Sequence, residues 1–160
     1  MGLADARGSA KIWQKSGGMM TDTLNNVRAF MSALPHSAAL GMRIDGVGAG
    51  HATVSMACDA RFVGDPVTGV IHGGAVSALM DTASGAAVMC HPSGPVGTAT
   101  LGLRIDYMRP ATRGQTITAR ADCYHVTRSV AFVRVTATDD DTAHPVAMAT
   151  GTFTLDGASA

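Results

Sequence analysis

The chain has 160 residues, 46% of them hydrophobic, which suffices for one domain with a buried core and argues against two. Twelve Lys and Arg side chains balance twelve Asp, so no net field attracts nucleic acid or an anionic membrane. No stretch reaches the roughly 18 to 20 apolar residues that span a bilayer, and the first residues lack the apolar core of a signal peptide. Cys58, Cys90 and Cys123 are widely spaced and fit reduced buried thiols. We expect a soluble cytoplasmic protein.

Residues 1–20 mix Gly, Ser, Lys and Ala without a period and predict a flexible tail, which leaves residues 21–157 as the one folded domain. The apolar residues of Thr23–Leu34 recur at helical spacing, and Pro35 follows them. We expect a short helix there that covers a sheet or frames a pocket.

Most of the remaining chain alternates apolar and polar side chains, the pattern of strands with one buried face. A long helix predicted over Gly74–Cys90 interrupts this pattern. The expected strands are two within residues 41–58, separated by the glycine-rich residues 46–50, followed by Thr98–Tyr107, Gln115–Val126, Ser129–Thr138 and Val146–Leu155. About six strands, one long central helix and no strand-helix-strand alternation predict an α+β fold with an antiparallel sheet.

The long helix has two unlike faces. Its apolar stripe, which should meet the sheet, comprises Val76, Leu79, Met80, Ala83, Ala87 and Cys90. Asp81 lies on the opposite side, where a lone Asp is most often a solvated surface residue. Its neighbours on that face are small and uncharged, however, whereas a solvent face normally carries Lys, Arg or Glu. Such a face suits close approach by a ligand or by another backbone.

Glycines mark the entrance of the same helix, at His72-Gly73-Gly74. The unpaired N–H groups and the dipole of a helix N-terminus suit a developing oxyanion, and a nearby carboxylate could attack the polarised carbonyl or direct water to it. Asp81 stands eight residues beyond Gly73, about 12 Å along the helix axis. Proton transfer needs about 3 Å. A carbonyl bound at Gly73 therefore requires Asp81 from a second copy, so that the chemistry depends on a dimer.

The combination of His72-Gly73-Gly74, Leu79, Asp81 and Gly85 resembles the phenylacetate-degradation (PaaI-like) branch of the hotdog-fold acyl-CoA thioesterases. The resemblance covers about residues 40–155, because a strand ending in Asp106-Tyr107-Met108-Arg109-Pro110 and the Arg128-Ser129 turn follow at family-like spacing. It implies a hotdog fold, two protomers joined edge to edge and two sites at their interface. A homodimer or a dimer of dimers is therefore expected.

The resemblance also assigns roles. It makes Asp81 the nucleophile or general base, and the Gly73 N–H the donor to the thioester oxygen. Thr100 matches a Ser or Thr that helps to place the attacking water or the carboxylate. Relatives often carry Asn in the loop before the helix, where this chain has Asp65, so we expect Asp65 to contact the substrate. An acid cannot donate a hydrogen bond to the carbonyl unless it is protonated.

Further substrate contacts are expected around these groups. His72 and Gly74 share the helix entrance, where a histidine is more often structural than catalytic. Arg109 and Arg128 stand at a strand end and a turn where a guanidinium could meet a phosphate of coenzyme A. An arginine at such a position is more often an ordinary surface residue, and the resemblance makes Arg128 the first choice. The other histidines lack ligand spacing, so no metal is expected, and no cofactor beyond the coenzyme A of the substrate.

Three functions remain open from the sequence. The first is hydrolysis of an acyl or aryl-acyl coenzyme A thioester, in which a good thiolate leaving group allows one base and an oxyanion site to suffice. The second is a hotdog-fold enoyl-thioester hydratase or dehydratase, although the His- and Pro-rich loop of the acyl-carrier-protein dehydratases is missing. The third is a non-catalytic acyl-CoA-binding module.

Overall fold

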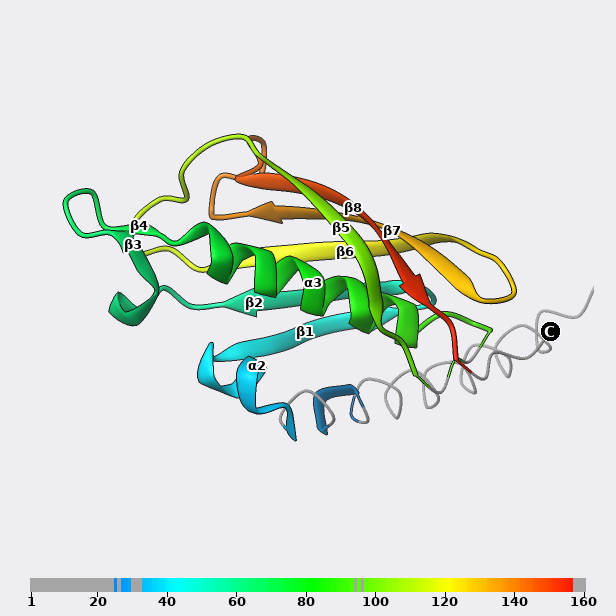
Figure 1. The fold of residues 1–160 in the computed structure, drawn as a ribbon. Helices are drawn as coiled ribbons and strands as arrows, with labels where there is room; N and C mark the ends of the chain where they lie inside the picture. Colours follow the sequence, from blue (N-terminus) through cyan, green and yellow to red (C-terminus); the bar gives the residue numbers. More distant parts are fainter. Residues whose placement is uncertain (1–24, 26, 30–32, 94, 96, 157–160) are drawn as a thin grey trace, which may run out of the picture.

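The computed structural model describes residues 25, 27–29, 33–93, 95 and 97–156. Within them, a six-stranded antiparallel sheet curves around the long helix α3, Gly73–Met89 (Figure 1). The strands lie in the order β1-β2-β6-β7-β8-β5, and their bounds are β1 Met42–Gly48, β2 His51–Met56, β5 Thr100–Tyr107, β6 Ile117–Val126, β7 Val130–Thr138 and β8 Ala147–Thr154. The expected α+β arrangement is confirmed.

The apolar stripe of α3 packs on the sheet as predicted. All six residues of the stripe are buried, and Leu79 and Met80 are completely so. Burial of a side chain of this size stabilises the fold by about 1.5–3 kcal/mol. The facing strands supply alternate residues such as Val54, Ala119 and Val133, which are also fully buried. On the other face of α3, Ser84 and Val88 are also buried, whereas Asp81 and Gly85 are partly exposed.

A short hairpin precedes α3 in a segment that the sequence pattern indicated as a loop. A single 3-10 turn, Ala60–Phe62, leads into β3, Val63–Asp65, which pairs with β4, Val70–Ile71. The hairpin packs closely against the start of α3, because a Cβ on Gly64 would lie 2.8 Å from the Cα of His72. Only glycine therefore fits there, and the contact fixes where the long helix begins.

The N-terminal region contains one short helix that the sequence pattern did not predict. Asn25, Val27–Ala29 and Ala33 are helical, whereas the rest of the predicted Thr23–Leu34 helix, apart from Leu34, lies outside the described residues, as does the predicted tail. Leu34 is the N-cap of a further helix, α2, Pro35–Ala39. Pro35 begins this helix, which suits a residue with a fixed φ and no N–H. No helix in the described part of the chain is long and apolar enough to cross a membrane.

Candidate active site

Asp81 is held by a residue from the strand that follows its helix. The Thr100 hydroxyl donates a hydrogen bond of 2.7 Å to Oδ1 of Asp81. Thr100 is the first residue of β5, and a register shift between Thr100 and Gly102 interrupts the pairing of β5 with β8 at this point. Among the described residues, none donates to Oδ2 of Asp81. One carboxylate oxygen is thus fixed and the other is available to a ligand or water.

At the entrance of α3, the ring of His72 caps the helix. Its Nδ1 accepts a hydrogen bond of 2.9 Å from the Gly74 N–H, so that Nδ1 carries no proton and Gly74 is not a free donor. The Gly73 N–H has no acceptor among the residues that the structure describes. It is therefore the donor left for a ligand, at the positive end of a helix dipole.

Two further side chains reach Gly73 that the sequence did not suggest as site residues. Tyr107, at the end of β5, donates from its hydroxyl to the Gly73 carbonyl over 2.6 Å. The Ser77 hydroxyl, one helical turn on, lies 2.6 Å from the Tyr107 hydroxyl and 3.1 Å from the same carbonyl. Its single proton serves one of these two contacts, and with Tyr107 donating to Gly73 it is available to the Tyr107 oxygen. The sequence predicted only that a strand ends at Tyr107, and no pattern in it indicated the contact with Gly73.

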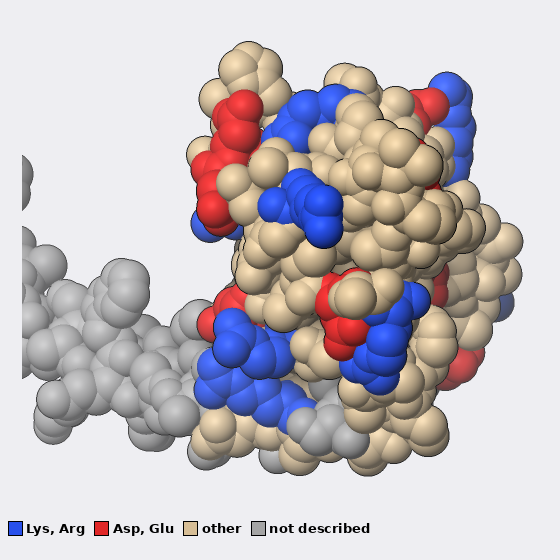
Figure 2. All heavy atoms as spheres, turned by 90° about the vertical axis from the view of Figure 1, so that its left-hand side faces the viewer, with Lys and Arg blue, Asp and Glu red and all other residues tan. Residues whose placement is uncertain are grey.

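A hollow of about 390 Å³ opens beside the helix entrance. Gly73 and Tyr107 border it, and most of its other lining is apolar, including Val70, Val76, Met108 and Val146. Positive and negative side chains are interspersed on this end of the molecule, without a field of one sign (Figure 2). The hollow therefore suits an uncharged organic group, and a charged portion of a ligand must be met by individual side chains.

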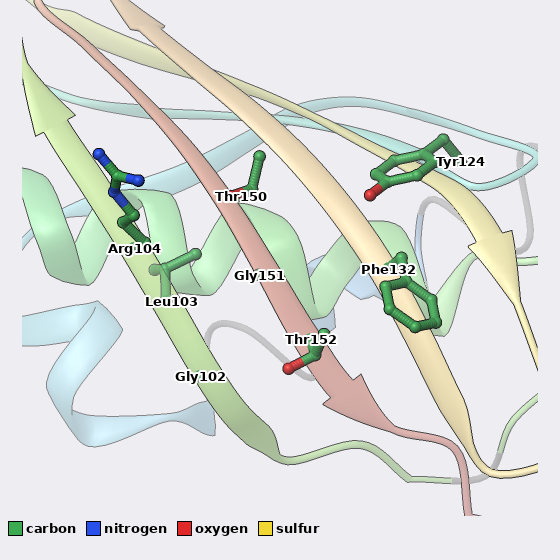
Figure 3. A pocket seen from close by; sticks show the side chains of 8 residues that line it. All are labelled: Gly102, Leu103, Arg104, Tyr124, Phe132, Thr150, Gly151 and Thr152. Carbon is green, nitrogen blue, oxygen red and sulfur yellow. The ribbon is translucent and has the colours of Figure 1, made fainter.

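A second hollow, of about 440 Å³, lies on the face of the sheet that points away from α3 (Figure 3). Tyr124 and Phe132, on β6 and β7, stand on one side of it, and Arg104 stands on the other, on β5 with Gly102, while Gly151 lies on β8 between them. Neither Asp81 nor Gly73 borders this second hollow. It is separate from the candidate site.

Asp65 is engaged in its own turn. Its carboxylate accepts hydrogen bonds from the Thr68 hydroxyl, at 2.6 Å, and from the Val67 N–H, at 2.9 Å. The Thr68 hydroxyl, with the Val67 N–H next, lowers the pKa of Asp65, so that this side chain is ionised and cannot donate to a carbonyl. Its predicted contact with substrate stays untested, and the geometry gives it a structural role in the β3–β4 hairpin.

Arg109 is also tied into the fold, which argues against its predicted phosphate contact. Its guanidinium binds both oxygens of Asp139, at 2.6 and 2.8 Å, and donates to the backbone carbonyls of His144 and Pro110. The Asp139 side chain is 0% exposed. An arginine that neutralises a buried carboxylate is not free to leave it for a ligand.

Arg128 stands in the turn between β6 and β7, which is closed by the Thr127 and Val130 backbones and the Thr127 hydroxyl. Its side chain is exposed and makes no hydrogen bond or ion pair with a described residue. The phosphate contact predicted for it remains open. No group of three His, Cys or Asp side chains suited to a metal ion occurs within the described residues.

Comparison with known proteins adds independent information. A family model described as the thioesterase superfamily matches residues 68–145. The medium/long-chain acyl-CoA thioesterase YigI of Escherichia coli strain K12 is 26% identical over 144 residues, which cover 78% of this chain and 87% of YigI.

Solved structures agree with this match. A mutant of the phenylacetic acid degradation protein PaaI from Thermus thermophilus is 31% identical, with a TM-score of 0.67, over 76% of this chain and 99% of that one. A Pseudomonas aeruginosa protein is 37% identical, with a TM-score of 0.74, over 82% and 98%. Escherichia coli PaaI, at 24% identity and a TM-score of 0.77, covers 88% and 97% and shares the fold.

Proposed function

This chain belongs to the PaaI-like branch of the hotdog-fold thioesterases, and we propose that it hydrolyses acyl-coenzyme A thioesters at a site shared by two copies. It is a thioester hydrolase by family. The observation that carries the proposal is the Asp81 carboxylate, one oxygen of which accepts a hydrogen bond from Thr100. Asp81 lies on the same helix whose N-terminus presents the Gly73 N–H. A base and an oxyanion donor are the two groups that thioester hydrolysis needs most.

The two groups of one chain belong to different sites in this proposal. Eight residues of helix separate Gly73 from Asp81, about 12 Å of axial rise, which is too far for both to act on one carbonyl. The carbonyl at Gly73 would therefore meet Asp81 of a second copy. A two-fold axis creates two such sites per dimer, each made from both chains.

The position of β5 supports this assembly. It lies at one end of the sheet, so that one side of the strand has no neighbour among the described residues, and its Leu101 is 59% exposed. Thr100, at its start, contacts Asp81, and Tyr107, at its end, contacts Gly73. Antiparallel pairing of two β5 strands would place the start of one beside the end of the other, and thus one copy's Asp81 near the other's Gly73.

Two routes to hydrolysis are compatible with these groups. As a general base, Asp81 takes a proton from water while the water oxygen attacks the thioester carbon and the carbonyl electrons move onto the oxygen held by Gly73. As a nucleophile, the free Oδ2 attacks the carbon itself, and water later hydrolyses the resulting anhydride. In both, the tetrahedral intermediate collapses, the carbon–sulfur bond breaks and coenzyme A leaves as its thiolate.

The surroundings support an apolar acyl group and a phosphate contact at a distance from it. The hollow beside Gly73 and Tyr107 is lined mainly by aliphatic side chains and would hold part of an acyl or aryl-acyl group. Arg128, exposed in its turn, would meet a phosphate of the nucleotide. His72 and Gly74 would frame the oxyanion donor through their mutual hydrogen bond. The reaction needs no cofactor beyond the coenzyme A of the substrate.

We assign the assembly to a homodimer or a dimer of such dimers, located in the cytoplasm. All three cysteines are free in the structure, and two of them are buried. Reduced thiols are typical of proteins in a reducing compartment, which supports the location.

The deciding experiment measures thiol release from short, medium, long and aryl acyl-CoA substrates by the wild type and by Asp81→Asn. We expect wild-type turnover on at least one class, and a loss of about 10²- to 10⁴-fold in the variant. Asp45→Asn, an exposed strand carboxylate beside Arg43, serves as the matched control and should keep full activity.

Other outcomes would separate the competing functions. An active Asp81→Asn enzyme contradicts the mechanism. Hydration of crotonyl-CoA without thiol release indicates a hydratase, and tight acyl-CoA binding without any product indicates a binding module. Label found in Asp81 after a single turnover in ¹⁸O-labelled water establishes the nucleophilic route, because general-base attack places the label only in the product acid.

A further inference from the structure

The peptide that joins Gly73 to Gly74 is held at both of its polar ends. Its carbonyl oxygen accepts a hydrogen bond from the Tyr107 hydroxyl at 2.6 Å, and its N–H donates to Nδ1 of His72 at 2.9 Å. The preceding peptide is anchored as well, because the carbonyl of His72 accepts from the Ala75 N–H at 2.9 Å. The Gly73 N–H, the proposed oxyanion donor, belongs to this preceding peptide and so shares a plane with the His72 carbonyl.

Two adjacent glycines at this point require such anchoring. Glycine has access to many more backbone conformations than other residues, so a Gly-Gly helix entrance is intrinsically loose. A side chain at either glycine would crowd these contacts. A Cβ on Gly73 would lie 3.3 Å from the Tyr107 ring and hydroxyl, and one on Gly74 would lie 2.9 Å from Nδ1 of His72. The glycines admit the two side chains, which in turn restrict the backbone.

Tyr107 is itself fixed from both directions. Ser77 lies 2.6 Å from its hydroxyl, so this oxygen has a second partner besides the Gly73 carbonyl. The residues that follow Tyr107 are anchored at the backbone, since the N–H groups of Met108 and Arg109 both donate to the carbonyl of Val146. The Arg109 guanidinium is bound to the buried Asp139. The hydroxyl therefore approaches Gly73 from a rigid strand end.

We propose that Tyr107, supported by Ser77, is a positioning residue that keeps the Gly73 N–H directed at the thioester oxygen. This inference rests on the proposed function. Rotation about the backbone bonds of Gly73 would turn its N–H away from the thioester carbonyl. The Tyr107 hydrogen bond opposes that rotation because it fixes the plane of the next peptide, Gly73–Gly74. Oxyanion stabilisation depends on donors that need no reorganisation during the reaction, so the effect belongs to kcat rather than to substrate binding.

The test compares Tyr107→Phe and Ser77→Ala with Tyr124→Phe as the matched control. Phenylalanine keeps the ring and removes only the hydroxyl, and Tyr124 is a half-exposed tyrosine on the far face of the sheet, with its ring against Arg134. We expect Tyr107→Phe to lower kcat about tenfold, less than the roughly 10²- to 10³-fold typical of deleting an oxyanion donor, with KM changed less than about twofold. Ser77→Ala should give a smaller loss in the same direction, and Tyr124→Phe none.

A spectroscopic measurement separates positioning from general loss of structure. In an Asp81→Asn background the bound thioester persists, and the stretching frequency of an isotopically labelled carbonyl reports its polarisation by the Gly73 N–H. Tyr107→Phe should move this band toward its frequency in water, and Tyr124→Phe should not. Ser77→Ala supplies the same readout if Tyr107→Phe lowers the melting temperature substantially.

The outcomes separate the positioning role from the proposed function. If the wild type is active and Tyr107→Phe leaves kcat and the carbonyl band unchanged, the positioning role alone is contradicted. A Tyr107→Phe variant with a raised KM and an unchanged kcat also contradicts the positioning role, since that pattern indicates lost substrate binding. A wild type that releases no thiol from any acyl-CoA contradicts the proposed function and the positioning role together.

Discussion

The hydroxyl of Thr100 donates to Oδ1 of Asp81 over 2.7 Å, and so links two residues that stand 19 positions apart on a helix and on the strand that follows it. Helix α3 contributes the carboxylate and β5 orients it. A serine or threonine hydroxyl at this position supplies one proton and retains lone pairs, so it can bind the carboxylate and still accept from water. The pair therefore acts as one unit in the proposed chemistry.

Removal of the Thr100 hydroxyl should impair turnover without loss of the fold. Thr100→Val keeps the shape of the side chain but leaves Asp81 free to rotate, and we expect kcat to fall about 10- to 100-fold. Thr100→Ser should retain most of the activity. Thr150→Val, on the exposed outer face of the sheet, is the matched control. Steady-state kinetics with one acyl-CoA decide the matter, and an unaffected Thr100→Val enzyme would remove Thr100 from the site.

The proposed division of the site between two copies predicts complementation between two inactive chains. Asp81→Asn retains the helix entrance, and Gly73→Val retains the carboxylate but crowds Tyr107. A mixed dimer has one intact site of two, so an equal mixture that exchanges freely should recover about a quarter of wild-type activity. Native mass spectrometry verifies that mixed dimers form. Mixed dimers without recovered activity would refute the division of Gly73 and Asp81 between two copies.

Exposure of Leu101 on the edge strand β5 predicts how the proposed dimer can be disrupted. Leu101→Lys introduces a charge that edge-to-edge pairing would have to desolvate, so sedimentation should show a smaller species and the thiol-release rate should fall in parallel. Val67 is 90% exposed in the β3–β4 hairpin and supplies the control Val67→Lys, which should leave the assembly unchanged. A Leu101→Lys protein of unchanged size would show that β5 does not join the copies.

The buried Asp139 predicts a specific loss of stability. Its carboxylate accepts from Arg109 twice, from the Thr112 N–H at 2.9 Å and from the Asp141 N–H at 3.1 Å. Asp139→Asn should lower the free energy of unfolding by about 3 kcal/mol, because it breaks a buried ion pair. Asp140→Asn, at the exposed neighbouring position, should change it little. Urea unfolding at neutral pH measures both, and equal effects would contradict the role assigned to the Arg109–Asp139 pair.

The same carboxylate sets the direction of the pH dependence. The Arg109 side chain, followed by the Thr112 N–H, holds the pKa of Asp139 far below its ordinary value. Its stabilisation is fully present above the unfolded-state pKa of about 3.9 and is lost as the pH falls from there toward the folded-state pKa. The difference in stability between wild type and Asp139→Asn should therefore be constant near neutral pH and shrink below about pH 4. A difference that grows on acidification would contradict this assignment.

The local parts of the fold could be predicted from the sequence because they repeat. The periodicity of α3 gave its range, which begins and ends one residue before the predicted Gly74 and Cys90. Strand β7, predicted to start at Ser129, starts at Val130 and ends at the predicted Thr138. The strands β3 and β4 were missed because three and two residues are too few to show an alternation.

Contacts between distant residues could not be predicted in this way. From the sequence, Arg109 was predicted only to stand at a strand end. Its partner Asp139 lies 30 positions later, and only the folded sheet brings the two side chains together. The link from Tyr107 to Gly73 spans 34 positions and depends on the angle at which β5 crosses α3. The link between Thr100 and Asp81 came from family resemblance, since no spacing rule relates a strand residue to a carboxylate on the preceding helix.

The order of the sheet also determines when in folding the site can form. Strand β5, which carries Thr100 and Tyr107, has β8 as its sheet neighbour in the described residues, and β8 begins 40 positions after the end of β5, at Ala147. During synthesis, Asp81 and Gly73 leave the ribosome long before the strand that supports their partners has a place in the sheet. Pairings over such sequence separations form late, since loop closure must precede any gain from the contact. Assembly of the Asp81 carboxylate and the proposed oxyanion donor is thus one of the last steps of folding, and a nascent chain without β8 would carry all the proposed reactive groups and no working arrangement of them.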